Sequence, residues 1–363
     1  MTPLALELRT RIAERGPIPF REFMDAALYD AEHGYYSSGR ASIGRRGDFF
    51  TNVSVGALFG RLLARQFAEM WERLGRPDQW TIVEQGAHRG EFARDVMEGL
   101  REFAPRAFAG MHYWIVEPND ALQASQIRML YDLPVTWFPR VEELPPFVGV
   151  HFSNELLDAF PVHLLVRCGG HWLERHVDFA NDAFVFKDRP PTDPRLAAHL
   201  AAFDVPDGFV AEVNLAALDW IAALAAKIER GYVLAIDYGY PREQFLERQA
   251  GTLSAYAGHM REPDPLARPG EIDLTAHVEF TSLIEHAERA GLRLHGFTDQ
   301  QRFMVGASRL HFTADPAPPA ELRAFKMLMH PELLGAAFKV VCFEKGDAGA
   351  LSGFEKGTVA NSG

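Results

Sequence analysis

The chain has 363 residues, of which 47% are apolar, and a formal net charge of −12 at pH 7. This size suits one large elaborated domain, or a catalytic domain with a second lobe. The acidic balance disfavours nucleic acid and anionic membranes as main partners, because both require a concentrated basic surface. No run of 18 apolar residues occurs and Met1 to Phe20 lacks a continuous apolar segment, so we expect neither a membrane span nor a signal peptide.

Cysteine usage and the first twenty residues bear on the cellular compartment. Only Cys168 and Cys342 are present, which excludes a disulfide framework and a cysteine-based metal site. The first twenty residues mix arginines with glutamates, unlike a transit peptide. We therefore expect a cytoplasmic protein. The histidines do not cluster at metal-ligand spacing, so no metal is predicted.

Four short apolar runs separated by helical patterns predict a parallel α/β core. A helical stripe from Leu58 to Trp71 precedes them, and an amphipathic helix from Phe92 to Phe103 follows the first run. The predicted strands are Trp80 to Gln85, His112 to Glu117, Val135 to Phe138 and Val148 to Ser153.

Further along, two strand-like runs between Val162 and Val177 flank Cys168-Gly169-Gly170 and predict a hairpin. Later patterns predict helices over Leu215 to Arg230 and Thr275 to Ala290, and strands over Tyr232 to Asp237, Leu292 to Phe297 and Ala337 to Phe343, the last two antiparallel. We expect a helical extension over 1–75, a catalytic domain over 76–346 with insertions at about 162–210 and 241–270, and a flexible tail over 347–363.

The first predicted strand ends in a glycine turn that leads directly into a helix. Its acidic-x-Gly-x-x-x-Gly spacing comprises Glu84, Gly86 and Gly90. The dinucleotide fingerprint is not met, because His88 replaces its middle glycine. The spacing suits S-adenosylmethionine, which carries no phosphate, while the competing interpretation is a plain turn between strand and helix. Glu117 ends the neighbouring strand, where a carboxylate can bind both hydroxyls of a nucleoside ribose.

Polar residues also follow the fourth and fifth core strands. Asn154 and Glu155 end one strand, and Asp237 and Tyr238 end the other. A helical turn would bring the Asp158 carboxylate back beside Asn154 or Glu155. Carboxylates at this edge can hold a guanidinium through paired, charge-assisted hydrogen bonds. The alternative is that these residues cap a helix and a turn.

The chain resembles the MidA family, which includes the mitochondrial arginine methyltransferase of complex I assembly. The resemblance runs from about Ile18 to Phe343. It rests on the Glu84 to Gly90 loop and on these blocks: Phe20-x-x-Phe23-Met24, Gly47-Asp48-Phe49-Phe50-Thr51, Val116-Glu117-Pro118, Asn154-Glu155-Leu156-Leu157-Asp158-Ala159-Phe160-Pro161, Asp237-Tyr238-Gly239-Tyr240, Gly251-Thr252-Leu253, Gly270-Glu271-Ile272-Asp273-Leu274-Thr275-Ala276-His277-Val278 and Phe338-Lys339-Val340.

The resemblance implies a class I, Rossmann-like methyltransferase fold with a seven-stranded sheet, inserted substrate-side elements, and S-adenosyl-L-methionine as cofactor. It further implies that Asp48 and Phe49 close over the cofactor, with Phe49 or Phe50 on the adenine. Two departures stand out. Ala87 and His88 occupy the second and third places of a family loop that usually reads Gly-Pro-Gly-x-Gly, and Ser254 to His259 lacks the usual basic residues.

His277 is a candidate proton acceptor, and Asp273 or Thr275 a cap for the helix after it. The leading hypothesis is N-methylation of an arginine on a protein partner, with no nucleic acid or membrane involved; an oligomer is compatible with it. Two alternatives stay open. One is a small-molecule acceptor, suggested by the altered Ser254 to His259 segment, and the other is a non-catalytic assembly protein with a methyltransferase-like core, suggested by His88.

Overall fold

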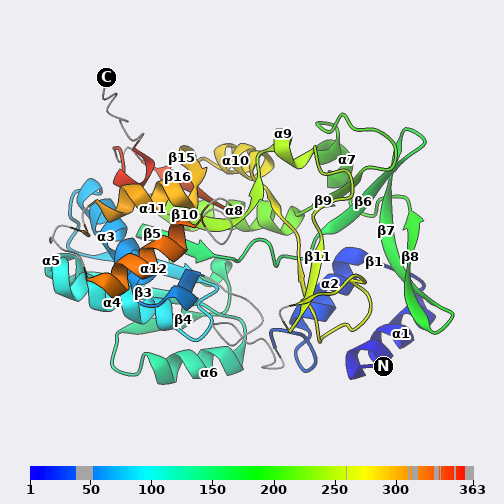
Figure 1. The fold of residues 1–363 in the computed structure, drawn as a ribbon, viewed down its shortest axis with the longest axis horizontal. Coiled ribbons are helices and arrows are strands. Elements are labelled where there is room, and N and C mark those ends of the chain that lie inside the picture. The colour runs from blue at the N-terminus through cyan, green and yellow to red at the C-terminus, as the bar shows by residue number, and fades with distance from the viewer. Residues whose placement is uncertain are drawn as a thin grey trace. The chain divides into compact units, whose positions relative to one another are not determined.

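The computed structural model describes residues 1–37, 52–258, 260–309, 311–312, 318–330, 335, 337–346 and 349–355. Figure 1 labels its helices and strands. Backbone contacts divide the chain into two compact units, and each is described by itself. Unit 1 comprises Met1–Phe50, Leu157–Asp219 and Gly239–Leu283, and unit 2 comprises Thr51–Leu156, Trp220–Tyr238 and Ile284–Gly363.

Unit 2 is built on a sheet whose described strands lie in the order β15-β16-β10-β5-β2-β3-β4 (Figure 1). The five strands from β10 to β4 are parallel, whereas β16 is antiparallel to both of its neighbours. These seven strands confirm the predicted fold class, and an eighth strand, β14 Val278–Glu279, pairs in parallel with Gly239 and Tyr240 of β10. Their bounds are β2 Trp80–Gln85, β3 Met111–Val116, β4 Val135–Phe138, β5 Phe147–Asn154, β10 Ile228–Tyr240, β15 Arg293–Asp299 and β16 Phe338–Lys345.

Helices cover both faces of this sheet, which is why the central strands read as continuous apolar runs. On one face, the Phe152 ring of β5 stacks on Phe92 of α4 with 4.5 Å between centroids and meets Phe67 of α3 at 5.7 Å. On the other, the His151 ring of β5 lies 5.4 Å from Trp220 of α8. The described helices and 3-10 helices that lie wholly or partly in unit 2 are η1 Asn52–Val55, α3 Leu58–Arg73, α4 Glu91–Phe103, α5 Pro105–Ala109, α6 Asp120–Met129, η2 Val141–Glu143, α8 Leu215–Lys227, α10 Phe280–Arg289, α11 Gln300–Ser308, α12 Pro319–Met329 and η4 Ser352–Phe354. Among the helices in the described ranges, none is long and apolar enough to cross a membrane.

Unit 1 contains an antiparallel sheet in the order β1-β7-β6-β9, with β8 beside β7, and a small sheet in the order β12-β11-β13. The predicted hairpin is confirmed as β6 and β7, joined by Gly169 and Gly170 with φ of 57° and 77°. The bounds are α1 Pro3–Arg15, β1 Ile18–Pro19, α2 Phe20–Tyr29, β6 His163–Cys168, β7 His171–Ala180, β8 Ala183–Arg189, α7 Arg195–Leu200, β9 Val210–Val213, α9 Arg242–Phe245, β11 Ser254–Ala257, β12 Met260–Arg261, β13 Asp273–Thr275 and β14 Val278–Glu279.

The helix predicted from Thr275 begins five residues later, at Phe280. Its first turn is capped by the Glu279 carboxylate, which accepts hydrogen bonds from the N–H groups of Thr281 (2.8 Å) and Ser282 (3.0 Å). Asp273 and Thr275 instead lie in β13, so the predicted capping by either residue is wrong. Glutamate is not a common N-cap residue, and the sequence rules therefore placed the start too early.

The predicted flexible tail is wrong for residues 349–355, which pack within unit 2. Leu351 is 1% exposed, and the Phe354 ring lies 5.3 Å from that of Phe303. The Ser352 hydroxyl donates a 2.7 Å hydrogen bond to Glu69. The composition of this segment is Gly- and Ala-rich, but two apolar anchors suffice to order it. The predicted boundary at residue 75 falls inside unit 2, because the two units interleave along the chain.

Candidate functional site

The strand order of unit 2 places a topological switch point between β2 and β5. The chain runs from β2 outward to β3 and β4, and then returns to β5 on the other side of β2. Open α/β sheets bind ligands at the carboxyl ends of strands at such a point. Nine of the predicted site residues lie at or next to these ends, within unit 2: Glu84, Gly86, His88, Gly90, Glu117, Asn154, Glu155, Asp237 and Tyr238.

The loop after β2 has a strained backbone. Gly86, His88 and Gly90 have φ of 81°, 45° and 93°, and positive φ disfavours a residue with a side chain such as His88. Gly86 is exposed, so its main chain is accessible to a ligand. A Cβ at Gly90 would lie 3.1 Å from Leu130 Cδ1, so the loop packs closely on the end of α6. Burial lowers the pKa of His88, and its imidazole is therefore neutral at pH 7.

Glu84 lies in the core of unit 2. It is 3% exposed, and its carboxyl accepts a 2.7 Å hydrogen bond from the Tyr113 hydroxyl of β3. Burial raises the pKa of Glu84 to about 8, although the bond from Tyr113 opposes this. The residue is therefore mostly protonated at neutral pH.

Glu117 follows β3, and a hydrogen-bond network fixes its carboxylate. One oxygen accepts from the Asn119 N–H and the other from the Gln126 side-chain amide of α6, both at 2.9 Å. Burial raises the pKa of Glu117, and these two hydrogen bonds act in the opposite direction. Gln126 is fully buried and was not predicted, because a glutamine on a largely polar helix carries no sequence signal of burial.

A chain of side-chain amides leads to the end of β5. The Asn52 side-chain amide donates to the side-chain oxygen Oδ1 of Asn154 at 2.7 Å. The Asn154 side-chain amide in turn donates to Glu155 Oε1 at 2.7 Å. Asn52 also exchanges two hydrogen bonds with Gln300 of α11, at 2.8 and 2.7 Å. Asn52 and Gln300 are both fully buried, and neither was predicted as a site residue from the sequence. These amides fix the orientation of Asn154 and, through it, of Glu155.

The ends of β5 and β10 are joined around Asp237. Its carboxylate accepts hydrogen bonds from the N–H of Leu156 (3.1 Å) and of Tyr238 (2.8 Å). Glu155 has a φ of 53°, and its N–H donates to the Ile236 carbonyl at 2.9 Å. The Tyr238 ring lies 3.9 Å from that of Phe338 on β16. Thus Glu155, Asp237 and Tyr238 share one edge of the sheet, as the chain order predicted.

Four predicted site residues remain. Asp48 and Phe49 are outside the described residues. Asp158 and His277 belong to unit 1. Residues 155–160 form bends and turns, so the helical turn expected to return Asp158 to Asn154 is absent from this described segment, and that prediction is wrong.

His277 packs against the Tyr240 ring at 5.2 Å, and its N–H donates to Thr252 at 3.0 Å. Burial, and secondly Arg248, lower the pKa of His277 to about 4. Its imidazole is therefore neutral at pH 7. Across the described ranges, no group of three or more His, Cys, Asp or Glu side chains could hold a metal ion.

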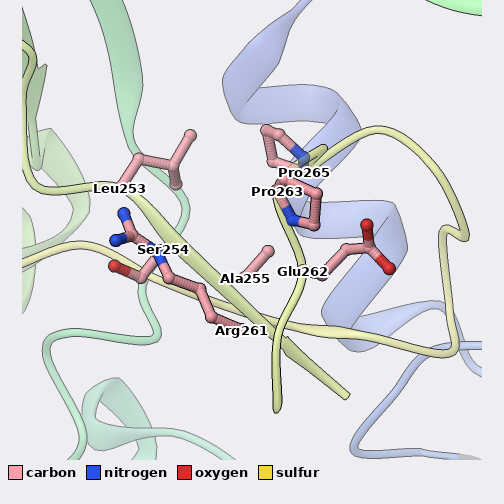
Figure 2. A pocket seen from close by; sticks show the side chains of 7 residues that line it. All are labelled: Leu253, Ser254, Ala255, Arg261, Glu262, Pro263 and Pro265. Atoms are coloured by element: carbon pink, nitrogen blue, oxygen red, sulfur yellow. The ribbon is translucent and has the colours of Figure 1, made fainter.

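Unit 1 also contains a pocket of about 340 Å³ at the segment that departs from the family pattern. Figure 2 shows the Arg261 guanidinium beside Ser254, with Leu253 next to them and the Glu262 carboxylate directed away. The full lining comprises Leu253, Ser254, Ala255, Arg261, Glu262, Pro263 and Pro265.

Comparisons with known proteins relate this chain to methyltransferases. The family model described as "Putative S-adenosyl-L-methionine-dependent methyltransferase" matches residues 62–298. The protein arginine methyltransferase NDUFAF7 homolog, mitochondrial, of Drosophila melanogaster is 30% identical over 94% of this chain and 85% of its own. The human protein arginine methyltransferase NDUFAF7, mitochondrial, is 26% identical over 93% and 82%.

A solved structure extends the likeness to three dimensions. A Burkholderia thailandensis protein bound to S-adenosyl-homocysteine is 34% identical with a TM-score of 0.88, over 97% of this chain and 94% of its own. The cytoplasmic location expected from the sequence is contradicted, because the curated relatives are named as mitochondrial. That expectation rested on cysteine usage and on the charges of the first twenty residues, neither of which identifies a compartment.

Proposed function

Because this chain belongs to the family of S-adenosyl-L-methionine-dependent methyltransferases, we propose that the methyl group goes to an arginine side chain of a protein. The enzyme is a methyltransferase and its cofactor is S-adenosylmethionine. The relatives named as protein arginine methyltransferases support an arginine acceptor. The observation that carries the proposal is that Glu155 and Asp237 lie at the same carboxyl edge as Gly86 and Glu117.

The residues at this edge fit the cofactor. Gly86 offers an exposed main chain with no side chain to obstruct a ligand. Each Glu117 oxygen accepts one of these hydrogen bonds and has a further lone pair, so the carboxylate can accept from two ribose hydroxyls. We propose that Gly86, His88, Gly90, Glu117 and Asn154 hold the cofactor. Glu84 is proposed to complete its site.

The bound cofactor supplies a methyl group on a positively charged sulfur. The protein must then align an acceptor nitrogen and accept its proton. A guanidinium is held best by carboxylates, which bind it through two parallel charge-assisted hydrogen bonds. We propose that Glu155 and Asp237 bind and orient it. Tyr238 is proposed to line the path of the departing proton.

The elements of unit 1 are proposed to recognise the protein that carries the arginine. This proposal covers the two predicted insertions, at about 162–210 and 241–270. The first forms the β6–β7–β8 strands and α7, and the second contains β11 and β12. Insertions of this kind vary around a catalytic scaffold and carry specificity.

The test uses radiolabelled cofactor, candidate acceptor proteins and mass spectrometry for methylarginine. We expect label on arginine with the wild-type protein. Glu155→Gln and Asp237→Asn should each lower kcat by about 100-fold or more, because a transition-state contact is lost. Glu142→Gln, which alters an exposed carboxylate on η2, is the matched control and should retain full activity. Tight binding of S-adenosylhomocysteine with no methylarginine in any acceptor would reject the proposal.

A small-molecule acceptor is the second candidate. The pocket of about 340 Å³ in unit 1 falls in the size range of small-molecule sites, and it occurs where the sequence departs from the family (Figure 2). The same radiolabel assay separates the two candidates. Label that appears in the low-molecular-mass fraction, and that Arg261→Gln reduces, would favour the small molecule.

A further inference from the structure

A single buried glutamine links three parts of unit 2. Gln126 of α6 is fully buried. Its side-chain nitrogen donates to the His88 carbonyl and to Glu117 Oε2, each at 2.9 Å. Its side-chain oxygen accepts from the Trp137 indole of β4, also at 2.9 Å. Both N–H groups of the amide, and its carbonyl, are thus engaged.

Trp137 determines which way this amide faces. An indole N–H can only donate, so the oxygen of the amide must lie on the Trp137 side. The two N–H groups then point towards His88 and Glu117. A flipped amide would place a carbonyl oxygen against a carboxylate and a backbone carbonyl, while leaving the indole N–H without an acceptor. Burial makes each of these mismatches costly.

We propose that Gln126 is a positioning residue of the cofactor site, which holds the Glu117 carboxylate and the 86–90 loop in their ligand-binding arrangement. This inference rests on the proposed role of Glu117 in binding the ribose hydroxyls. Gln126 acts through two groups of different kinds. One is a carboxylate that must accept from a ligand, and the other is the carbonyl of the strained residue His88.

The substitution Gln126→Glu tests this role, because it keeps the shape and the acceptor for Trp137 but removes two donors. The dissociation constant of S-adenosylhomocysteine, from calorimetry, should rise about 10- to 100-fold, since a bond to a charged group is lost. The kcat at saturating cofactor should stay within about twofold, because the lost contact serves binding and not the reaction step. Gln123→Glu introduces the same charge on the same helix and is the matched control, with an expected change below about twofold.

Two further measurements separate positioning from a general loss of structure. An S-adenosylhomocysteine analogue that lacks both ribose hydroxyls should lose less affinity on Gln126→Glu than S-adenosylhomocysteine does, because only the contribution of the 86–90 loop remains. In the double variant with Glu117→Gln, the two losses should not add. If Gln126→Glu does not fold, Trp137→Phe leaves the glutamine in place but free to flip, and should weaken binding by about three- to tenfold.

The outcomes are distinguishable. No binding of S-adenosylhomocysteine by the wild type would reject the proposed function itself. Normal wild-type binding with an unaffected Glu117→Gln would reject the role of that carboxylate, on which the inference depends. If Glu117→Gln weakens binding but Gln126→Glu and Trp137→Phe do not, the positioning role is wrong. Equal losses for both ligands, or full additivity, would also overturn it.

Discussion

The buried pair formed by Asn52 and Gln300 allows a quantitative test of how the end of β5 is held. The two amides exchange hydrogen bonds of 2.8 and 2.7 Å, and both residues are fully buried. Asn52→Leu removes one partner and leaves the Gln300 side-chain amide and the Asn154 side-chain oxygen short of a hydrogen bond. Gln300→Leu removes the other partner and leaves the Asn52 amide and the Leu328 main-chain carbonyl short of a hydrogen bond.

The magnitudes follow from the cost of unpaired buried polar groups. Each such group costs about 1–3 kcal/mol, whereas replacing both partners by apolar side chains removes the penalty between them. We therefore expect each single variant to lower the free energy of unfolding by about 3 kcal/mol. The double variant should lose about 3 kcal/mol instead of the roughly 6 kcal/mol that additivity requires.

Urea denaturation followed by tryptophan fluorescence suits this measurement, because Trp172 is the one tryptophan of the sequence outside unit 2. Gln123→Leu on α6 is the control for adding an apolar side chain, and should change stability by less than about 0.5 kcal/mol. A double variant whose loss equals the sum of the single losses within about 0.5 kcal/mol would refute the reasoning. The amides would then be independently solvated and would not form one network.

Three further predictions concern other residues. In wild type, Glu84 keeps its proton when folded up to about pH 8 but loses it near 4.5 when unfolded, so its contribution to stability should fall as pH rises through that window. Glu84→Gln should flatten this dependence in urea titrations; equal slopes for both proteins would contradict it. Gly251→Ala should lower the melting temperature more than Gly258→Ala. Both glycines have positive φ, but only at Gly251 would a Cβ clash with Glu212 Oε1, whereas Gly258 faces open space. Equal shifts would show that φ alone matters. If His277 accepts the proton, the kcat of the wild type should fall on the acid side near pH 4 and not near pH 6.5. The reason is that burial lowers the pKa of His277 to about 4. An acid limb near pH 6.5 that His277→Gln abolishes would show that burial does not lower the pKa of His277.

Chain order and periodicity were sufficient to predict the sheet and much of its ligand-binding edge. In parallel sheets the residues after successive strands meet at one edge, so Gly86, Glu117, Asn154 and Asp237 could be grouped without coordinates. The predicted strand ends agree with β2 and β4 at both ends and with β3 and β5 within one residue. Local rules work here because each strand is a short apolar run bounded by a turn.

The residues that hold this edge were not predictable by the same rules. Asn52, Gln126 and Gln300 are polar residues in or beside helices, where local patterns assign them to the surface. Their burial depends on partners far along the chain, since Asn52 and Gln300 are 248 positions apart. The predicted position of Asp158 was wrong for a related reason. Its placement assumed a helix after β5, and the chain instead leaves unit 2 after Leu156.

These hydrogen-bond networks hold two residues whose backbone conformation is strained. Among the described non-glycine residues with positive φ, Arg76 follows a helix end and Asn181 and Asp182 form a hairpin turn, whereas His88 and Glu155 lie after β2 and β5 at the switch point. Such a conformation costs about 1–2 kcal/mol per residue and persists only where surrounding contacts enforce it.

Gln126 holds the His88 carbonyl, while Asn154 and Ile236 hold the side chain and N–H of Glu155. The same buried amides that orient the candidate ligand-binding side chains therefore also fix the backbone from which those side chains extend. A site arranged in this way is already ordered before a ligand arrives, so less conformational entropy is lost on binding. It follows that substitutions in the amide networks should weaken binding more than their distance from the ligand suggests, because each releases a strained loop as well as a side chain.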